Sequence, residues 1–99
     1  MSFKVRFTKA ARDDVRRLTG FMLERDVSAA HRARSAIAKS IEFLSDFPFS
    51  CRKAMPDNPF LRELVIPFGS SGYVALFEIS QADMVTIIAL RHQREEDFH

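Results

Sequence analysis

Arginine and histidine residues in the C-terminal part of the chain have the side chains best suited to chemistry in this sequence. Arg62 lies in the predicted strand 61–68, which would place it on one face with Leu64 and Ile66, and Glu63 and Val65 on the other. Arg91 and His92 close the most apolar segment, just before Arg94. Two arginines on one face of a sheet would bind an anion, such as an RNA backbone, a phosphate-like transition state or a partner's carboxylate. The alternative is that they form ion pairs with Glu63, Glu78 or Glu95.

Proton transfer would depend on His92. Cleavage of RNA needs a general base for the 2′-hydroxyl and an acid for the leaving oxygen. His92 is the best candidate because imidazole titrates near neutral pH. In a nuclease, Arg62 and Arg91 would hold the phosphate and His92 would move the proton. Tyr73 begins an apolar segment and offers no obvious second group, so the cationic residues fit a binding surface better than a catalyst.

The sequence predicts no metal site and no cofactor. His31, His92 and His99 do not form the paired spacing of a zinc site. The three glycines stand in separate contexts and form no phosphate-binding loop. Cys51 is the only cysteine, so an internal disulfide is impossible and a reducing cytoplasm is the expected location. No histidine motif accompanies Cys51, and we do not expect it to be catalytic.

The length of 99 residues predicts a single domain over 1–99. Apolar residues make up 46% of the chain and charged residues 28%, which is ordinary for a globular protein and excludes a disordered tail or a disulfide scaffold. No apolar run reaches the length of a membrane helix, and no signal peptide is expected. We therefore expect no membrane partner.

The charge is unevenly distributed along the chain. Residues 1–26 hold seven Lys/Arg and four Asp/Glu, whereas residues 61–99 hold three and six. A basic surface in the first part would suit an acidic partner or nucleic acid. A solvated helix face is the alternative, and direct binding to nucleic acid is left open.

Hydrophobic periodicity predicts the elements of the first half. Residues 3–7 alternate apolar and charged, which predicts a strand. Apolar residues at helical spacing then predict one helix over about 9–25, capped by Thr8, and a second to about residue 46, capped by Asp26 or Ser28. The short link predicts an antiparallel helical hairpin.

The second half is predicted to be a loop followed by strands. Prolines mark 47–59 as a loop, and residues 61–68, 73–79 and 84–92 form three strands joined by short turns. The order strand-helix-helix-three strands predicts an α+β domain (β-α-α-β-β-β), with a four-stranded antiparallel sheet and the helical hairpin packed on one face. The first strand is expected at an edge or beside the last strand.

Three segments, taken in order, resemble a known family. They are Arg62-Glu63-Leu64 before a Gly-Ser turn, Tyr73-Val74-Ala75-Leu76-Phe77-Glu78-Ile79, and Ile88-Ala89-Leu90-Arg91-His92-Gln93-Arg94-Glu95. With the order of elements, they resemble the ParE/RelE superfamily of toxins from type II toxin–antitoxin systems, and the last segment looks like the ParE branch.

The resemblance implies one of two activities. RelE-like members are ribosome-dependent mRNA endoribonucleases, with strand arginines where Arg62 and Arg91 stand, but Phe98 replaces their common C-terminal tyrosine. ParE-like members are plasmid-stabilising toxins that inhibit growth by binding DNA gyrase. The missing hydroxyl and the Arg-His-x-Arg-Glu run favour the ParE-like branch, which implies a binding protein and not an enzyme. Arg91, His92 and Arg94 would then lie in or near the target-binding surface.

Both branches imply a cognate antitoxin with a tail that folds on the toxin. An apolar groove between the helices and the sheet would receive an acidic segment of that tail. Candidate anchors for it are Phe21, Met22, Phe47 and Phe49, for which ordinary core positions are the alternative. We also expect a short acidic-hydrophobic protein to be encoded next to this one.

Overall fold

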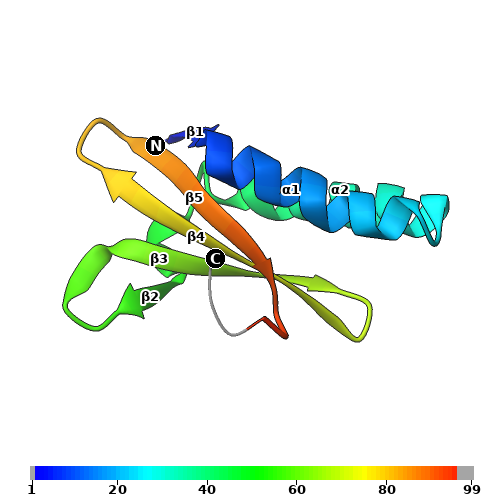
Figure 1. The fold of residues 1–99 in the computed structure, drawn as a ribbon. Helices are drawn as coiled ribbons and strands as arrows, with labels where there is room; N and C mark the ends of the chain where they lie inside the picture. The colour runs from blue at the N-terminus through cyan, green and yellow to red at the C-terminus, as the bar shows by residue number, and fades with distance from the viewer. Residues whose placement is uncertain (1, 96–99) are drawn as a thin grey trace.

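Two helices lie together on one side of a twisted sheet (Figure 1). The structure is a computed structural model and describes residues 2–95. Along the chain the elements are β1 (Lys4–Phe7), α1 (Lys9–Leu23), α2 (Val27–Phe43), the 3₁₀ turn η1 (Pro48–Ser50), β2 (Arg52–Met55), β3 (Asn58–Phe68), β4 (Ser71–Ser80) and β5 (Met84–His92). The α+β class and the helical hairpin on one face are confirmed.

The predicted four-stranded antiparallel sheet is wrong in two respects. The sheet has five strands in the order β1-β5-β4-β3-β2, and β1 runs parallel to β5. The additional strand, β2, lies within the segment 47–59 that was predicted as a loop. Pro56 and Asp57 form the turn of a β2–β3 hairpin, and Pro59 sits beside its irregular pairing, where a missing N–H is tolerated. β2 lacks an alternating pattern because it is a short, mostly exposed edge strand.

Both helices begin at side-chain caps. The Thr8 hydroxyl accepts the N–H of Ala11 at 3.1 Å, as predicted. For the second helix the structure decides between the two candidate caps, since the Asp26 carboxylate accepts the N–H of Ala29 at 3.0 Å. Each cap satisfies an N–H group that has no partner within the helix. The helices end two to three residues earlier than predicted, and neither helix of residues 2–95 is long and apolar enough to cross a membrane.

The core lies between the helices and the sheet. In β3, Leu64 and Ile66 share a face, as predicted, and are buried, while Val65 on the other face is exposed. Each large apolar side chain that is fully buried contributes roughly 1.5–3 kcal/mol relative to exposure. The largest of these side chains are Phe77, Leu44, Ile66, Ile87, Leu90 and Val85.

A β-bulge interrupts the alternation of β5. Ile87 pairs with Phe77, but Ala89 pairs with Leu76, so Ile88 is an extra residue in this strand. Before the bulge the core-facing residues of β5 are odd-numbered, and after it they are even-numbered. The bulge therefore decides which way every later side chain of the strand points.

Candidate functional site

The structure does not bring Arg62 and Arg91 together. Arg62 pairs with Phe77, which packs in the core under the helices, whereas Arg91 pairs with Val74, which alternation places on the opposite face. Directly paired residues of antiparallel strands share a face, so the two arginines lie on opposite faces of the sheet. The bulge at Ile88 is the reason, because unbroken alternation would have put Arg91 on the helix face. The joint anion site considered from the sequence is not formed.

Arg62 binds backbone carbonyls of its own chain. Its Nε donates to the Pro59 carbonyl at 2.7 Å, and one terminal nitrogen donates to the carbonyls of Cys51 at 2.7 Å and Phe49 at 3.2 Å. The guanidinium carbon also lies 5.4 Å from the centroid of the Phe49 ring. These contacts join the segment before β2 to β3, and an incoming phosphate would have to displace them.

Arg91 holds the turn that follows β5. One terminal nitrogen donates to the Glu95 carbonyl at 2.8 Å and makes longer bonds, of 3.4 Å, to the carbonyls of His92 and Gln93. The charge of Arg91 is thus directed at backbone oxygens of residues 92–95. This arrangement fixes the position of the next cation, Arg94.

His92 links the end of β5 to two neighbouring segments. Its Nδ1 lies 3.1 Å from the backbone nitrogen of Arg94, and its Nε2 lies 3.1 Å from the hydroxyl of Ser71. Because a backbone N–H can only donate, Nδ1 must be the acceptor, and these partners assign the neutral ring its hydrogen on Nε2. The ring meets Tyr73 edge to face, with centroids 5.9 Å apart. At least one of these nitrogens would have to leave its partner before His92 could transfer a proton to or from a substrate.

A pocket of about 650 Å³ opens between the C-terminal half of α1 and the β3–β4 turn. Its wall is mostly apolar, and the Tyr73 hydroxyl donates to the Met22 sulfur at 3.4 Å within it. Burial raises the pKa of the Tyr73 phenol, which therefore stays protonated at neutral pH. Gly72 is required behind this wall, since a Cβ there would collide with the backbone of Ile66. The lining residues are Arg17, Leu18, Phe21, Met22, Phe68, Gly69, Ser70, Ser71, Tyr73, His92, Arg94 and Glu95.

Carboxylates close the outer edge of β5 beside this pocket. Asp14 is only 5% exposed, and its carboxylate accepts the N–H of Leu90 at 2.9 Å. Glu95 accepts the N–H of His92 at 3.0 Å and pairs with Arg17 at 3.2 Å. The bond from His92, aided by Arg17, lowers the pKa of Glu95. β1 covers only the first part of β5, so these side chains supply the partners that a neighbouring strand would otherwise provide.

Sequence reasoning missed the role of Asp14, although a signal was present. Asp14 falls on the buried stripe of α1, between Ala11 and Leu18. Because a buried carboxylate needs a hydrogen-bond donor, the position of Asp14 on this stripe predicts a donor from another buried segment.

No group of three His, Cys, Asp or Glu within residues 2–95 is placed to hold a metal ion. Cys51 is half-buried, and burial raises the pKa of its thiol against the opposing effect of Arg62. A raised pKa leaves little reactive thiolate at neutral pH.

Comparison with known proteins identifies the family. Residues 5–97 match the family described as the ParE toxin of the type II toxin–antitoxin system parDE. The chain belongs to this toxin family. Toxin RelE1 of Caulobacter vibrioides is 33% identical over 79 residues, covering 80% of this chain and 82% of that protein. Toxin RelE3 of the same organism is 34% identical over 85 residues, covering 86% and 88%.

Two solved structures share the toxin's fold. A chain of the chromosomal ParDE system from P. aeruginosa aligns with a TM-score of 0.74 at 14% identity, covering 92% of the toxin and 96% of that chain. A chain of the toxin–antitoxin complex RelBE2 from Mycobacterium tuberculosis aligns with a TM-score of 0.59 at 22% identity, covering 96% and 95%. The toxin therefore belongs to a type II toxin–antitoxin family whose relatives carry both ParE and RelE names.

The four predicted antitoxin anchors of the toxin fall into two separate places. Phe21 and Met22 line the pocket near the end of α1. Phe47 and Phe49 follow α2, at the opposite end of the helical hairpin. There Phe47 packs on Phe43 with ring centroids 5.5 Å apart, and Phe49 packs on Phe3 and Phe60 at 6.3 and 6.2 Å. We call these two neighbouring groups of rings the aromatic cluster. The single groove expected between helices and sheet is thus replaced by two surfaces.

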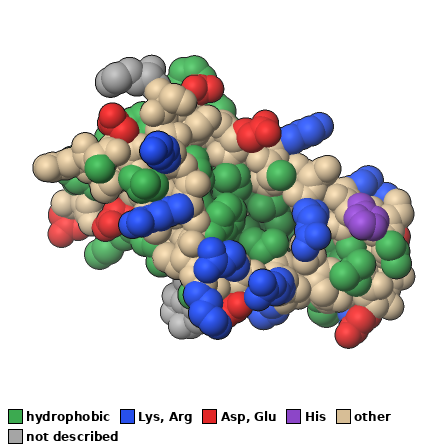
Figure 2. Space-filling view, turned by 90° about the horizontal axis from the view of Figure 1, so that it is seen from above, with side chains coloured by type: hydrophobic (Ala, Val, Ile, Leu, Met, Phe, Trp, Pro, Cys, Tyr) green, Lys and Arg blue, Asp and Glu red, His purple; other side chains and the backbone are tan. Residues whose placement is uncertain are grey.

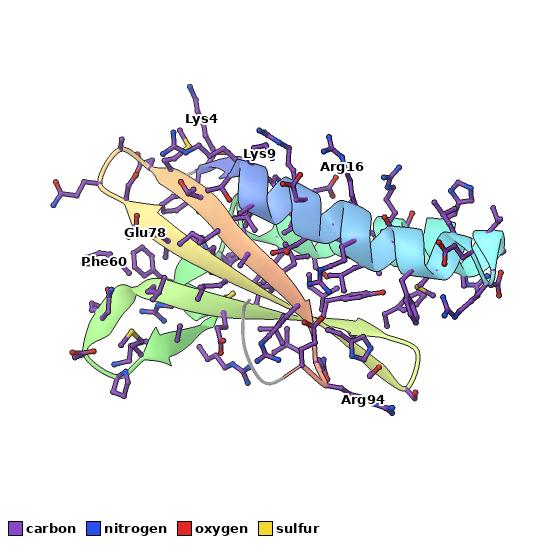
Figure 3. All side chains as sticks on the ribbon, in the orientation of Figure 1. Lys4, Lys9, Arg16, Phe60, Glu78 and Arg94 are labelled. Atoms are coloured by element: carbon purple, nitrogen blue, oxygen red, sulfur yellow. The ribbon has the colours of Figure 1, made fainter. Side chains whose placement is uncertain are left out.

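The cations of the toxin also lie on more than one side. Figure 3 shows Arg94 beyond the end of β5, whereas Lys4, Lys9 and Arg16 extend outward on the side of β1 and α1. On the helical side, seen from above in Figure 2, Lys and Arg side chains surround hydrophobic ones. Of the three predicted target-binding residues, Arg91 points to the face opposite the helices, while His92 and Arg94 line the pocket. Phe98 and His99 lie outside the described residues.

Proposed function

We propose that this toxin acts by binding DNA gyrase and is neutralised by a cognate antitoxin. The proposal depends mainly on where the two strand arginines lie and what they bind. Arg62 and Arg91 occupy opposite faces of the sheet and direct their charges at backbone carbonyls. A nuclease of the expected kind needs them together on one phosphate, so their separation favours a binding mode of action.

The target-binding surface in this proposal is centred on Arg94. Arg91 and His92 both bond to the turn of residues 92–95, and Arg94 is exposed on that turn. We assign direct contact with the target to Arg94 and a supporting role to Arg91 and His92. Because the backbone of this turn is already held, pairing of Arg94 with a carboxylate of a partner orders only the arginine side chain and not the turn.

The antitoxin is proposed to cover Phe21 and Met22 at the pocket and Phe47 and Phe49 in the aromatic cluster. Both fold neighbours come from toxin–antitoxin systems, which supports an antitoxin as the partner. Phe21 and Phe47 are 60% and 58% exposed, so neither belongs to the core. Exposed aromatic side chains are typical of protein interfaces.

A RelE-like, ribosome-dependent mRNA endoribonuclease is the second candidate. The names of the relatives favour it, since two proteins at 33% and 34% identity are called RelE toxins. In that case Arg62 and Arg91 would hold the RNA and His92 would move the proton, after rearrangement of the contacts described above.

Three assays test the candidates, and the last two separate them. Induced expression without antitoxin should arrest bacterial growth, and normal growth would contradict both. Purified toxin should inhibit supercoiling by gyrase, and Arg94→Ala should weaken this inhibition about tenfold or more. Arg34→Ala, which changes an exposed arginine on α2, is the matched control and should inhibit like the unmodified toxin. Unchanged supercoiling, together with mRNA cleavage on programmed ribosomes that is lost in His92→Ala, would establish the nuclease instead.

A further inference from the structure

The pocket beside α1 is a mostly apolar space at the protein surface that residues 2–95 leave open. Its volume of about 650 Å³ lies within the range of roughly 300–1,000 Å³ that is typical of ligand sites. Leu18, Met22, Phe68 and Tyr73 supply apolar wall, and Phe21 stands largely exposed at its edge. A bulky side chain of a partner would lose much of its contact with water on entering this space, and such partly enclosed apolar contacts are typical of binding hot spots.

The charge at the mouth of this pocket is positive. Arg17 pairs with Glu95 at 3.2 Å and lies 3.7 Å from Asp14, so these two carboxylates offset its charge. No ion pair within residues 2–95 involves Arg94. The Arg25 guanidinium lies 3.8 Å over the Phe21 ring and donates to the Phe21 carbonyl at 2.9 Å, and its ion-pair contact with Glu24 is 3.9 Å long. A carboxylate brought to the mouth would therefore be favoured by Arg94 and Arg25.

We propose that this pocket receives the main anchor of the antitoxin. The anchor is a bulky aliphatic or aromatic side chain that enters beside Tyr73 and Met22, carried on a segment with a carboxylate that reaches Arg94. The inference rests on the proposed function, because that function supplies the antitoxin as the partner. It goes beyond that function because it assigns the main anchor to the pocket and not to the aromatic cluster, and because it states the kind of side chain that enters.

The position of Arg94 adds a mechanism of neutralisation. Arg94 lies at the mouth of the pocket and is also the residue assigned to the target. An antitoxin segment seated in the pocket covers this guanidinium and pairs with it. Antitoxin and target then compete for the same cation, so that neutralisation needs no change in the fold of the toxin.

The test measures the affinity of the toxin for the purified antitoxin, the protein encoded next to it, by titration calorimetry. Phe21→Ala removes the edge of the pocket, Ser70→Trp places an indole at its mouth, and Arg94→Glu reverses the charge there. Each should weaken binding about tenfold or more, which corresponds to about 1.4 kcal/mol. Met55→Ala on exposed β2 and Arg34→Glu on α2 are matched controls expected to stay within about twofold.

The possible outcomes are distinct. Tight binding of the antitoxin to the unmodified toxin, with no loss in Phe21→Ala, Ser70→Trp and Arg94→Glu, would overturn the pocket while leaving the proposed function standing. Failure of the unmodified toxin to bind this antitoxin would overturn both. Circular dichroism and thermal unfolding identify a variant that loses binding because it does not fold. Because Phe21 and Ser70 are exposed, Phe21→Ala and Ser70→Trp are expected to fold.

Discussion

The two ends of the helical hairpin both expose phenylalanine, but they are built differently. At the aromatic cluster, rings pack against one another and Arg62 ties the neighbouring backbone together. At the pocket, Phe21 borders a space that residues 2–95 leave open, with charged groups around its mouth. Exposed aromatic side chains are therefore compatible with an interface at both ends, but only the pocket end has room for an inserted side chain of a partner.

The largest expected effect removes the arginine at the aromatic-cluster end. Arg62→Met keeps the apolar stem but leaves three carbonyls without their charged donor, and it should lower the free energy of unfolding by about 2–3 kcal/mol. Urea denaturation measures this loss. Arg52→Met, which breaks an exposed pair with Glu63, is the control and should cost less than about 1 kcal/mol. Equal losses would mean that Arg62 does not hold this end together.

The second prediction concerns the pocket end. Asp14→Ala leaves the buried N–H of Leu90 without its acceptor and should cost about 2 kcal/mol in the same assay. Asp14→Asn retains an oxygen that can accept this bond and should cost clearly less. An identical loss in the two variants would show that the charge of Asp14, and not the hydrogen bond, is what matters.

A third prediction separates the two nitrogens of His92. In His92→Asn, the side-chain oxygen can take the place of Nδ1 and accept the N–H of Arg94. In His92→Gln, the side-chain amide reaches the position of Nε2, beside Ser71, and the acceptor for Arg94 is lost. Hydrogen exchange at the Arg94 amide should therefore accelerate about fivefold in His92→Gln, as expected from loss of a bond worth about 1 kcal/mol, and change little in His92→Asn. The reverse order would contradict the assignment of Nδ1 as the acceptor.

The smallest effect is a pH dependence at the mouth of the pocket. The pKa of Glu95 is lower in the folded toxin than its ordinary value of 4.5, because of the bond from His92 and the pair with Arg17. The ionised Glu95 carboxylate contributes fully to the free energy of unfolding above pH 4.5, and this contribution is lost as the pH falls through the lowered pKa. Because this side chain is 37% exposed, the contribution is only a few tenths of a kcal/mol. Glu95→Gln should make unfolding stability less dependent on pH in this acidic range, and an unchanged pH profile would contradict the effect.

Local physics made much of the fold predictable. Thr8 and Asp26 cap their helices because a short polar side chain reaches an N–H group three residues ahead, whatever the rest of the chain does. The apolar stripes of the helices and the alternation around Leu64 and Ile66 are likewise local patterns that match their burial. The ordered segments ending at Arg94-Glu95 were sufficient to indicate the superfamily, and the family match confirms it.

Only the tertiary structure decided the arrangement of the candidate site. A single extra residue, Ile88, turned Arg91 away from the face of Arg62, and no alternation pattern reveals such a bulge. Two of the partners of Arg62, the carbonyls of Phe49 and Cys51, approach it only when β3 pairs with β2. The pocket exists only where α1 passes the β3–β4 turn. Residue types and spacing are properties of the chain, whereas faces, acceptors and empty space arise from contacts between segments distant in sequence.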